Sequence, residues 1–196
     1  MSIAPFISGL IKVCLILFCS LSIWLTNTSS SYADINNDRY DGNIFVVYAG
    51  NGSLVPPKLT LKQSFDRKIP VILVYYLDDN SDSKQFAFIV SRLQEFYGKV
   101  ASIIPVSVDS IPVKEKYQPD EVGYYYRGAI PQTVVLDENR QKVFDEAGVI
   151  QFEAVDDVLR KVFNLLPRSQ SVELKRKTFN EFNSELVPEE KGNGQS

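Results

Sequence analysis

The stretch that decides the fold is Val71-Ile-Leu-Val-Tyr-Tyr-Leu77, which runs directly into the polar turn Asp78-Asp-Asn-Ser-Asp-Ser-Lys84. Seven consecutive apolar or aromatic residues, three of them β-branched, are typical of a strand buried on both faces of a sheet. After the turn, apolar residues recur at helical spacing up to Gly98, where a helix is expected to end: Phe86, Ile89, Val90, Leu93, Phe96 and Tyr97. The stretch therefore predicts a central strand, a polar loop and a helix.

The rest of the chain carries weaker patterns of the same kind. Thr60-Leu-Lys-Gln63 has the capping-box pattern and predicts a short helix to about Arg67. Apolar periodicity predicts an amphipathic helix over 152–166, which Pro167 would stop. Residues 111–123, rich in proline and charge, are expected to form a long loop. Strands are predicted at 44–48, 101–108, 133–136 and 141–144, the last two joined by a hairpin turn.

The first 33 residues have the features of an export signal. Lys12 precedes an uncharged stretch at 13–25, and Ser31-Tyr-Ala33 fits a cleavage site. The alternative is an uncleaved N-terminal anchor, which is less favoured because a spanning helix needs about 20 apolar residues. Residues 1–33 contain one Lys and no acid, so 20 basic and 24 acidic residues remain, a net charge of −4. This balance gives no support to nucleic acid binding.

The position of the cysteines and the absence of histidine exclude several kinds of catalytic and metal site. Both cysteines, Cys14 and Cys19, lie within the N-terminal apolar stretch, and the chain has no histidine. A mature protein starting at Asp34 would have no thiolate, no Ser-His-Asp or Cys-His pair, and almost no means of holding zinc or haem. We therefore expect a protein that is not an enzyme and that has no cofactor and no metal.

The loop at the carboxyl end of a central strand, placed on a helix N-terminus, is where α/β proteins usually carry function. The order of predicted elements over 44–166 resembles the thioredoxin-like fold, whose redox members carry Cys-Gly-Pro-Cys-Lys on this turn. Here Lys84 keeps the lysine, whereas Asn80 and Ser83 stand in the places of the two cysteines. Val74 stands where those members bury an acid. The resemblance implies an α/β fold with a central mixed sheet flanked by helices.

A second match lies in Arg127-Gly-Ala-Ile-Pro-Gln-Thr-Val-Val135. Pro131 is the family's cis-proline by this resemblance, and the backbone of Ile130 would then be free to pair with an extended peptide. Seven residues form the predicted peptide groove between this loop and the polar turn: Asp79, Asn80, Ser83, Tyr125, Tyr126, Ile130 and Pro131.

Asp78, Asp79 and Asp82 cluster on the polar turn, and their oxygens are of the kind that hard cations prefer. The turn lacks an Asp-x-Asp-x-Asp-Gly pattern. Capping of the following helix by Asn80, Ser81 or Asp82 is therefore the favoured interpretation.

Beyond the domain at 44–167 and the preceding arm at 34–43, a C-terminal amphipathic helix is predicted over 168–187, with a stripe of Val172, Phe179, Phe182 and Leu186. Packing of this stripe on its own domain is favoured over contact with a partner. The polar residues 188–196 are expected to form a disordered tail.

Several strings resemble the thylakoid membrane photosystem I accumulation factors of cyanobacteria: Asn37-Asp-Arg-Tyr-Asp-Gly-Asn-Ile-Phe45, Tyr48-Ala-Gly-Asn-Gly-Ser-Leu-Val-Pro56, Phe96-Tyr-Gly98, Pro105-Val-Ser-Val-Asp-Ser110, Gly123-Tyr-Tyr-Tyr126, Leu166-Pro-Arg-Ser169, Glu173-Leu-Lys-Arg176 and Phe179-Asn-Glu-Phe-Asn183. The resemblance implies an exported protein of the thylakoid membrane or lumen that binds photosystem I subunits or assembly factors. Two alternatives remain open: a thiol-disulfide oxidoreductase working with borrowed cysteines, and a structural membrane-associated protein.

Overall fold

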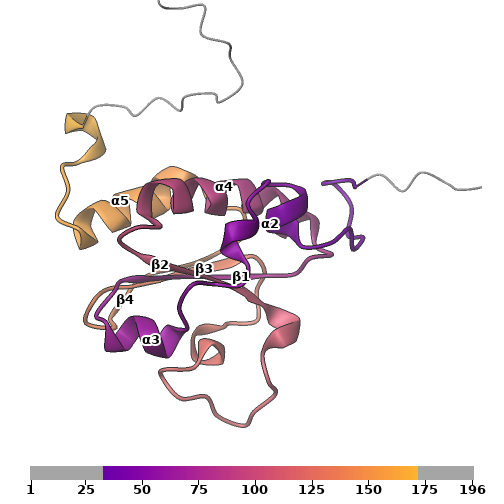
Figure 1. Cartoon of the computed structure of the whole chain (residues 1–196), viewed down its shortest axis with the longest axis horizontal. Coiled ribbons are helices and arrows are strands. Elements are labelled where there is room, and N and C mark those ends of the chain that lie inside the picture. The colour runs from indigo at the N-terminus through magenta and orange to yellow at the C-terminus, as the bar shows by residue number, and fades with distance from the viewer. Residues whose placement is uncertain (1–32, 172–196) are drawn as a thin grey trace, which may run out of the picture.

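The computed structural model describes residues 33–171 of the 196-residue chain. Four strands and four α-helices form its framework, with short 3₁₀ turns between them (Figure 1). In chain order these elements are α2 (Ile44–Val47), α3 (Leu61–Asp66), β1 (Val71–Tyr76), α4 (Ser81–Tyr97), β2 (Ser102–Ser107), β3 (Gln132–Leu136), β4 (Lys142–Ala147) and α5 (Phe152–Val162).

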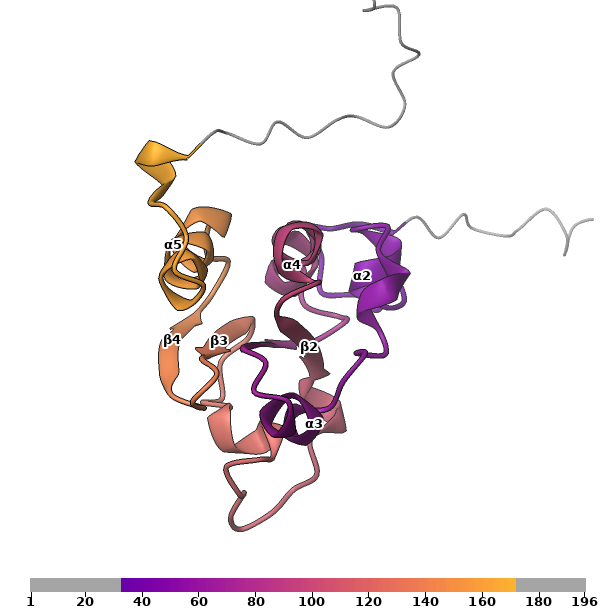
Figure 2. The same cartoon turned by 60° about the vertical axis from the view of Figure 1, so that its left-hand side comes forward.

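The strands form one mixed sheet in the order β2-β1-β3-β4. β1 pairs parallel to β2, as the crossover through α4 requires, and β3 pairs antiparallel with both β1 and β4. Helices α4 and α5 lie side by side over one face of the sheet, and α3 covers the other face (Figure 2). This topology confirms the predicted thioredoxin-like α/β fold, with β1 as the central strand.

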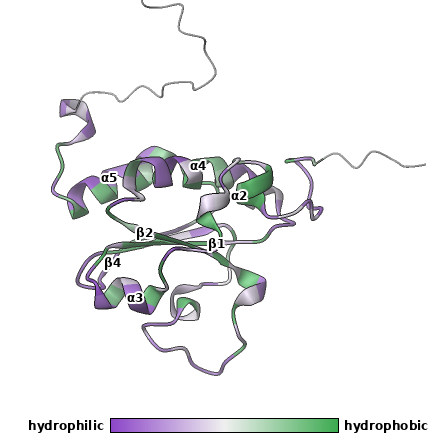
Figure 3. Ribbon diagram, viewed as in Figure 1, coloured by the Kyte–Doolittle hydropathy of each residue, from purple (hydrophilic) through white to green (hydrophobic). Residues whose placement is uncertain are grey.

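The side chains of β1 contribute to two hydrophobic cores, because they point alternately to the two faces of the sheet. Ile72, Val74 and Tyr76 belong to the core under α4 and α5, whereas the alternate residues of β1 belong to the core beside α3. All six residues of β1 are buried, and the centre of the sheet is correspondingly apolar (Figure 3). Each large apolar side chain buried in this way contributes about 1.5–3 kcal/mol. Burial on both faces explains why the strand lacks the alternating polar pattern of a surface strand.

The prediction of a strand at 44–48 was wrong, because this segment forms α2. Asn43 caps the helix by accepting a hydrogen bond from the backbone N–H of Phe45 at 3.2 Å. Ile44 and Phe45 are fully buried, while the next two residues, Val46 and Val47, are exposed. Burial in a block rather than in alternation indicates one face of a short helix. The local cap and the core contact of Phe45 with Tyr76 outweigh the β preference of the aliphatic residues.

Helix α5 ends four residues before the predicted boundary. Phe163 is its C-terminal cap, and Asn164 follows with a φ of 50°, a left-handed conformation that asparagine tolerates at helix ends. Leu165 and Leu166 are consequently exposed. A 3₁₀ turn at Arg168–Gln170 follows. Most of the predicted helix at 168–187, its apolar stripe and the tail at 188–196 lie outside the described residues, as does the signal segment up to residue 32.

Candidate functional site

The turn between β1 and α4 is held by hydrogen bonds of Asn80 and Ser83, the two residues that the resemblance places at the cysteine positions. Asn80 is the N-cap of α4, and its Oδ1 accepts a hydrogen bond from the backbone N–H of Ser83 at 2.8 Å. The hydroxyl of Ser83 donates to the same Oδ1 at 2.9 Å and accepts from the N–H of Leu77 at 3.3 Å. Ser83 is buried. The predicted capping by Asn80 is therefore confirmed, and both polar side chains serve to hold the turn.

Lys84 is fully buried, and the N-terminal arm surrounds its ammonium group. The Nζ atom lies 3.1 Å from the carbonyl oxygen of Asp34, 3.0 Å from that of Asn37 and 2.6 Å from that of Arg39. The carboxylate of Asp41 accepts a further hydrogen bond at 2.8 Å. An ammonium group removed from water needs such partners. Lys84 therefore fixes residues 34–41 against the start of α4.

Tyr48 completes this cluster. Its hydroxyl donates to Asp41 at 2.6 Å, and its ring lies 5.3 Å from the Lys84 Nζ. The hydrogen bond from Lys84, followed by that from Tyr48, holds the pKa of Asp41 well below its usual value. Burial by itself would lower the pKa of Lys84, but the hydrogen bonds with Asp41 and Tyr48 outweigh it and leave that pKa raised. Both groups are thus charged at neutral pH.

The arm also contacts the first turn of α4 and the end of β1. The carboxylate of Asp38 accepts from the N–H of Ser81 at 2.8 Å, and this bond lowers the pKa of Asp38. A carboxylate is favoured here because the N–H groups at a helix start carry partial positive charge. Asp78 accepts from the N–H of Ile44 at 2.9 Å, although burial raises the pKa of Asp78. Within residues 33–171 no group of acidic residues is arranged to hold a metal ion.

The loop before β3 lies at the same end of the sheet as the polar turn. The register pairs Tyr75 with Gln132, so the residues after β1 and those before β3 meet at one edge. The Ile130–Pro131 peptide bond is cis, and the carbonyl of Pro131 accepts from Gly148 at 2.7 Å. The backbone N–H and carbonyl of Ile130 have no hydrogen bond within the described part of the chain, and Ile130 is only partly buried.

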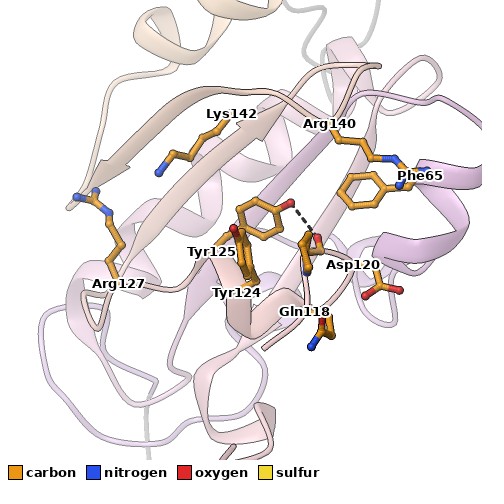
Figure 4. Close-up of a pocket in the computed structure, with 9 residues that line it drawn as sticks. Phe65, Gln118, Asp120, Tyr124, Tyr125, Arg127, Arg140 and Lys142 are labelled. Carbon is orange, nitrogen blue, oxygen red and sulfur yellow. Dashed lines mark hydrogen bonds between the residues drawn. The ribbon is translucent and has the colours of Figure 1, made fainter. Parts of the chain in front are cut away.

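The two predicted tyrosines lie on the opposite face of the sheet from α4. Tyr126 packs against Tyr75 with ring centroids 5.2 Å apart, in the core beside α3. Tyr125 donates from its hydroxyl to the Pro119 carbonyl at 2.9 Å and lines a separate hollow below the β3–β4 hairpin (Figure 4). The structure thus gathers Asp79, Asn80, Ser83, Ile130 and Pro131 at one sheet end and places the tyrosines apart from them. That the five residues form a peptide groove stays a prediction.

The sequence analysis missed the role of Lys84 as the anchor of the arm. Lys84 lies within the buried stripe of α4, next to Ser83 and one turn before Ala87, and a lysine in an apolar stripe indicates a buried partner. Its partner Asp41 precedes it by 43 residues, and no local spacing connects the two.

Together the topology and the site define a thioredoxin-like protein whose turn carries capping side chains in place of a thiol pair. The chain is 65% identical, over 173 residues, to the thylakoid membrane protein slr1796 of Synechocystis sp., and the match covers 85% of this chain and 86% of that protein. The chain belongs to the family of this thylakoid membrane protein.

Other comparisons are more distant. Among solved structures, the chain is similar to the germline-specific thioredoxin Deadhead of Drosophila melanogaster, at 19% identity over 52% of this chain and 93% of that one, with a TM-score of 0.40. It is also similar to a poplar thioredoxin h mutant, at 19% identity over 57% of this chain and 78% of that one, with a TM-score of 0.41. No family model matches the chain. Between residues 33 and 171, no helix is long and apolar enough to span a membrane.

Proposed function

We propose that this chain is a non-catalytic thioredoxin-like protein of the thylakoid membrane or lumen, which supports photosystem I accumulation by holding partner segments. The partners would be photosystem I subunits or assembly factors. Two findings support the location and the process: the family relation to a thylakoid membrane protein, and the strings that resemble the photosystem I accumulation factors.

The observation that carries the binding role is the unpaired backbone of Ile130. Its N–H and carbonyl groups lie at a sheet end, beside a turn whose own polar side chains are already hydrogen-bonded. An extended segment can pair with such free backbone groups, and main-chain hydrogen bonds supply affinity without any thiol. Asp79, which is exposed and precedes the capping residue, adds a carboxylate to the same end of the sheet.

The proposal that the protein is not catalytic rests on the roles of Asn80 and Ser83, which stand in the places of the two cysteines. Asn80 caps α4 and Ser83 is buried beneath the cap, so both side chains have structural partners. Neither an amide nor a hydroxyl forms a thiolate nucleophile. The site is therefore suited to holding a segment in place, and thiol exchange has no group to perform it.

The test uses a Synechocystis strain that lacks slr1796 and expresses this full chain. Ile130→Pro removes the free N–H of the loop, and Ile130→Val is the matched control because it keeps the N–H and a β-branched side chain. Photosystem I content is measured by P700 absorbance per chlorophyll, and partners are identified after affinity purification from solubilised thylakoids.

We expect the unmodified chain and Ile130→Val to restore photosystem I, and Ile130→Pro to restore less than half of that level with fewer co-purifying subunits. Thermal melting of each purified variant separates loss of binding from loss of folding. In addition, the amide of Ile130 in the unmodified protein should become protected from hydrogen exchange when partner is bound. A folded Ile130→Pro variant with full activity, together with an unprotected Ile130 amide, would refute the proposal.

A further inference from the structure

The hollow below the β3–β4 hairpin is a second surface, distinct from the sheet end that carries Ile130. Its volume is about 660 Å³. One wall is the segment from Gln118 to Tyr125, and the other is the hairpin with its turn (Figure 4). The lining includes three basic residues, Arg127, Arg140 and Lys142, against one acid, Asp120. The hollow therefore carries a local excess of positive charge in a chain whose net charge is −3.

The positive charge forms two centres, one at each end of the hollow. At one end, Asp145 pairs with Arg127 at 2.8 Å and with Lys142 at 2.7 Å, so two cations share one carboxylate and one positive charge remains. At the other end, the guanidinium of Arg140 lies 5.0 Å from the ring centroid of Phe65. Arg140 has no carboxylate and no side-chain hydrogen bond within residues 33–171. Its hydrogen-bonding capacity is therefore free for a ligand.

The floor between the two centres is aromatic. Tyr124 and Tyr125 pack edge to face with centroids 5.0 Å apart. The Tyr125 hydroxyl is held by Pro119, whereas the Tyr124 hydroxyl has no partner in the described part of the chain, and Tyr124 is half exposed. These rings offer apolar area to aliphatic stems, and the free hydroxyl offers one more donor.

The spacing of the two centres selects the class of ligand. The first centre is held by Asp145 on β4, and Arg140 of the second centre precedes Asp145 by five residues. The three steps of β4 from Lys142 to Asp145 alone correspond to about 10 Å of extended chain, and Arg140 lies beyond Lys142 in the hairpin turn. A single phosphate or carboxylate can reach only one of these centres. An extended peptide advances about 3.4 Å per residue, so acidic side chains about four positions apart reach both.

We infer that this hollow binds an extended acidic peptide segment of another protein, with one carboxylate on Arg140 and a second near Arg127 and Lys142. The aromatic floor contacts the aliphatic stems between them. Asp120, at the rim, opposes binding by like-charge repulsion. The inference does not depend on the groove at Ile130, because the two surfaces share no residue.

The probe is an N-acetylated, C-amidated hexaglutamate peptide, titrated into the mature chain starting at Asp34 and followed by amide shifts in NMR and by calorimetry. Hexaglutamine is the uncharged control peptide, and hexathymidylate tests for a nucleic acid ligand. Arg140→Gln removes the free guanidinium, and Arg67→Gln is the matched control because Arg67, the C-cap residue of α3, is exposed and does not line the hollow.

We expect hexaglutamate to shift the amides of Tyr124, Tyr125 and Arg140, with binding that weakens from 50 to 500 mM salt. Arg140→Gln should weaken binding about fivefold, the size of one exposed ion pair, whereas Arg67→Gln should change it less than twofold. Asp120→Asn should strengthen binding, a gain that unfolding cannot produce.

Three results would overturn the inference. The first is that hexaglutamate at 50 mM salt causes no amide shifts in the hollow. The second is an equal loss of affinity in Arg67→Gln and Arg140→Gln. The third is tighter binding of hexathymidylate than of hexaglutamate, which would assign the surface to nucleic acid.

Discussion

The turn at 78–84 and the hollow beside Tyr124 are both polar surfaces, but they differ in how far the chain itself satisfies their polar groups. At the turn, the ammonium of Lys84 is surrounded by oxygens of residues 34–41, and Asn80, Ser83 and Asp78 have partners as well. In the hollow, the guanidinium of Arg140 and the hydroxyl of Tyr124 have no hydrogen-bond partner among the described residues. A buried charged or polar group without hydrogen-bond partners would destabilise the fold, so the groups at the turn need their partners. The groups in the hollow are exposed to water and can bind a ligand.

Polar groups that the chain leaves without a partner are the candidates for binding in this protein. In redox thioredoxin-like proteins the turn itself carries the chemistry, so its position alone invites a functional assignment. Here residues 34–41 of the arm are fixed against that turn, and the turn is part of the packed structure. Within residues 33–171, the backbone of Ile130 and the guanidinium of Arg140 are groups with hydrogen-bonding capacity left for a partner.

The largest effect on stability should come from removing the ammonium group of Lys84 from its cluster of oxygen partners. Lys84→Met removes the buried ammonium that holds the arm, and it leaves Asp41 paired with the exposed Arg39, at 3.3 Å, in place of the buried Lys84. Removing one member of a buried ion pair typically costs 3–5 kcal/mol, so we expect a loss of about 3 kcal/mol in the free energy of unfolding. Urea unfolding of the chain from Asp34 to Ser196 measures this loss.

Lys62→Met is the control for that measurement. Lys62 forms an exposed pair with Asp66 at 3.0 Å on α3, and surface substitutions of this kind change stability by less than about 0.5 kcal/mol. Equal stability losses in the two variants would show that the arm is not held by Lys84. Amide hydrogen exchange of residues 34–41 should also increase in Lys84→Met alone.

A smaller effect, specific to the same cluster, should appear on acidification. The pKa of Asp41 is depressed in the folded protein, so between its ordinary value of about 4 and its lower folded value the unfolded chain binds more protons. The stability that Asp41 contributes is therefore fully present above pH 5 and decreases as the pH falls below 4. Asp41→Asn cannot take up this proton, so its stability deficit at pH 7 should narrow at pH 3.

Urea midpoints of both proteins at pH 7 and pH 3 measure this change. Asp66→Asn, which removes an exposed carboxylate from α3, serves as the control for the loss of a surface charge. If the difference between Asp41→Asn and the unmodified protein does not change with pH, the pKa of Asp41 is the same in the folded and unfolded protein, and the cluster does not stabilise the carboxylate.

Most of the fold followed from patterns that act over short distances. The buried run at 71–77, the periodicity after Asn80 and the capping box at Thr60 each produced the expected element. The segment at 44–48 failed because its conformation depends on the Asn43 cap and on Phe45 packing against Tyr76, a contact 31 residues away in the sequence. β-branched composition carries no information about such a contact.

The candidate site was only partly predictable for the same reason. The register of β1 and β3 was implicit in the fold, so the turn and the Ile130 loop could be placed at one end of the sheet. Clustering of Arg140 with Phe65, and of Lys84 with Asp41, joins residues far apart in sequence through the tertiary structure. Tyr125 and Tyr126 were assigned to the groove by proximity in sequence to Pro131, but a 3₁₀ turn at Val122–Tyr125 directs them to the α3 face.

We expect this thioredoxin-like protein to support photosystem I without a thiol of its own, and a chain that lacks both cysteines shows whether it does. The Synechocystis strain lacking slr1796 would express the full chain with Cys14→Ser and Cys19→Ser, the only two cysteines. Immunoblotting confirms that the protein reaches the thylakoids at the level of the unmodified chain. We expect P700 absorbance per chlorophyll to be restored to the level given by the unmodified chain. Photosystem I content that stays at the level of the deletion strain, with the cysteine-free protein present in the thylakoids, would contradict the account.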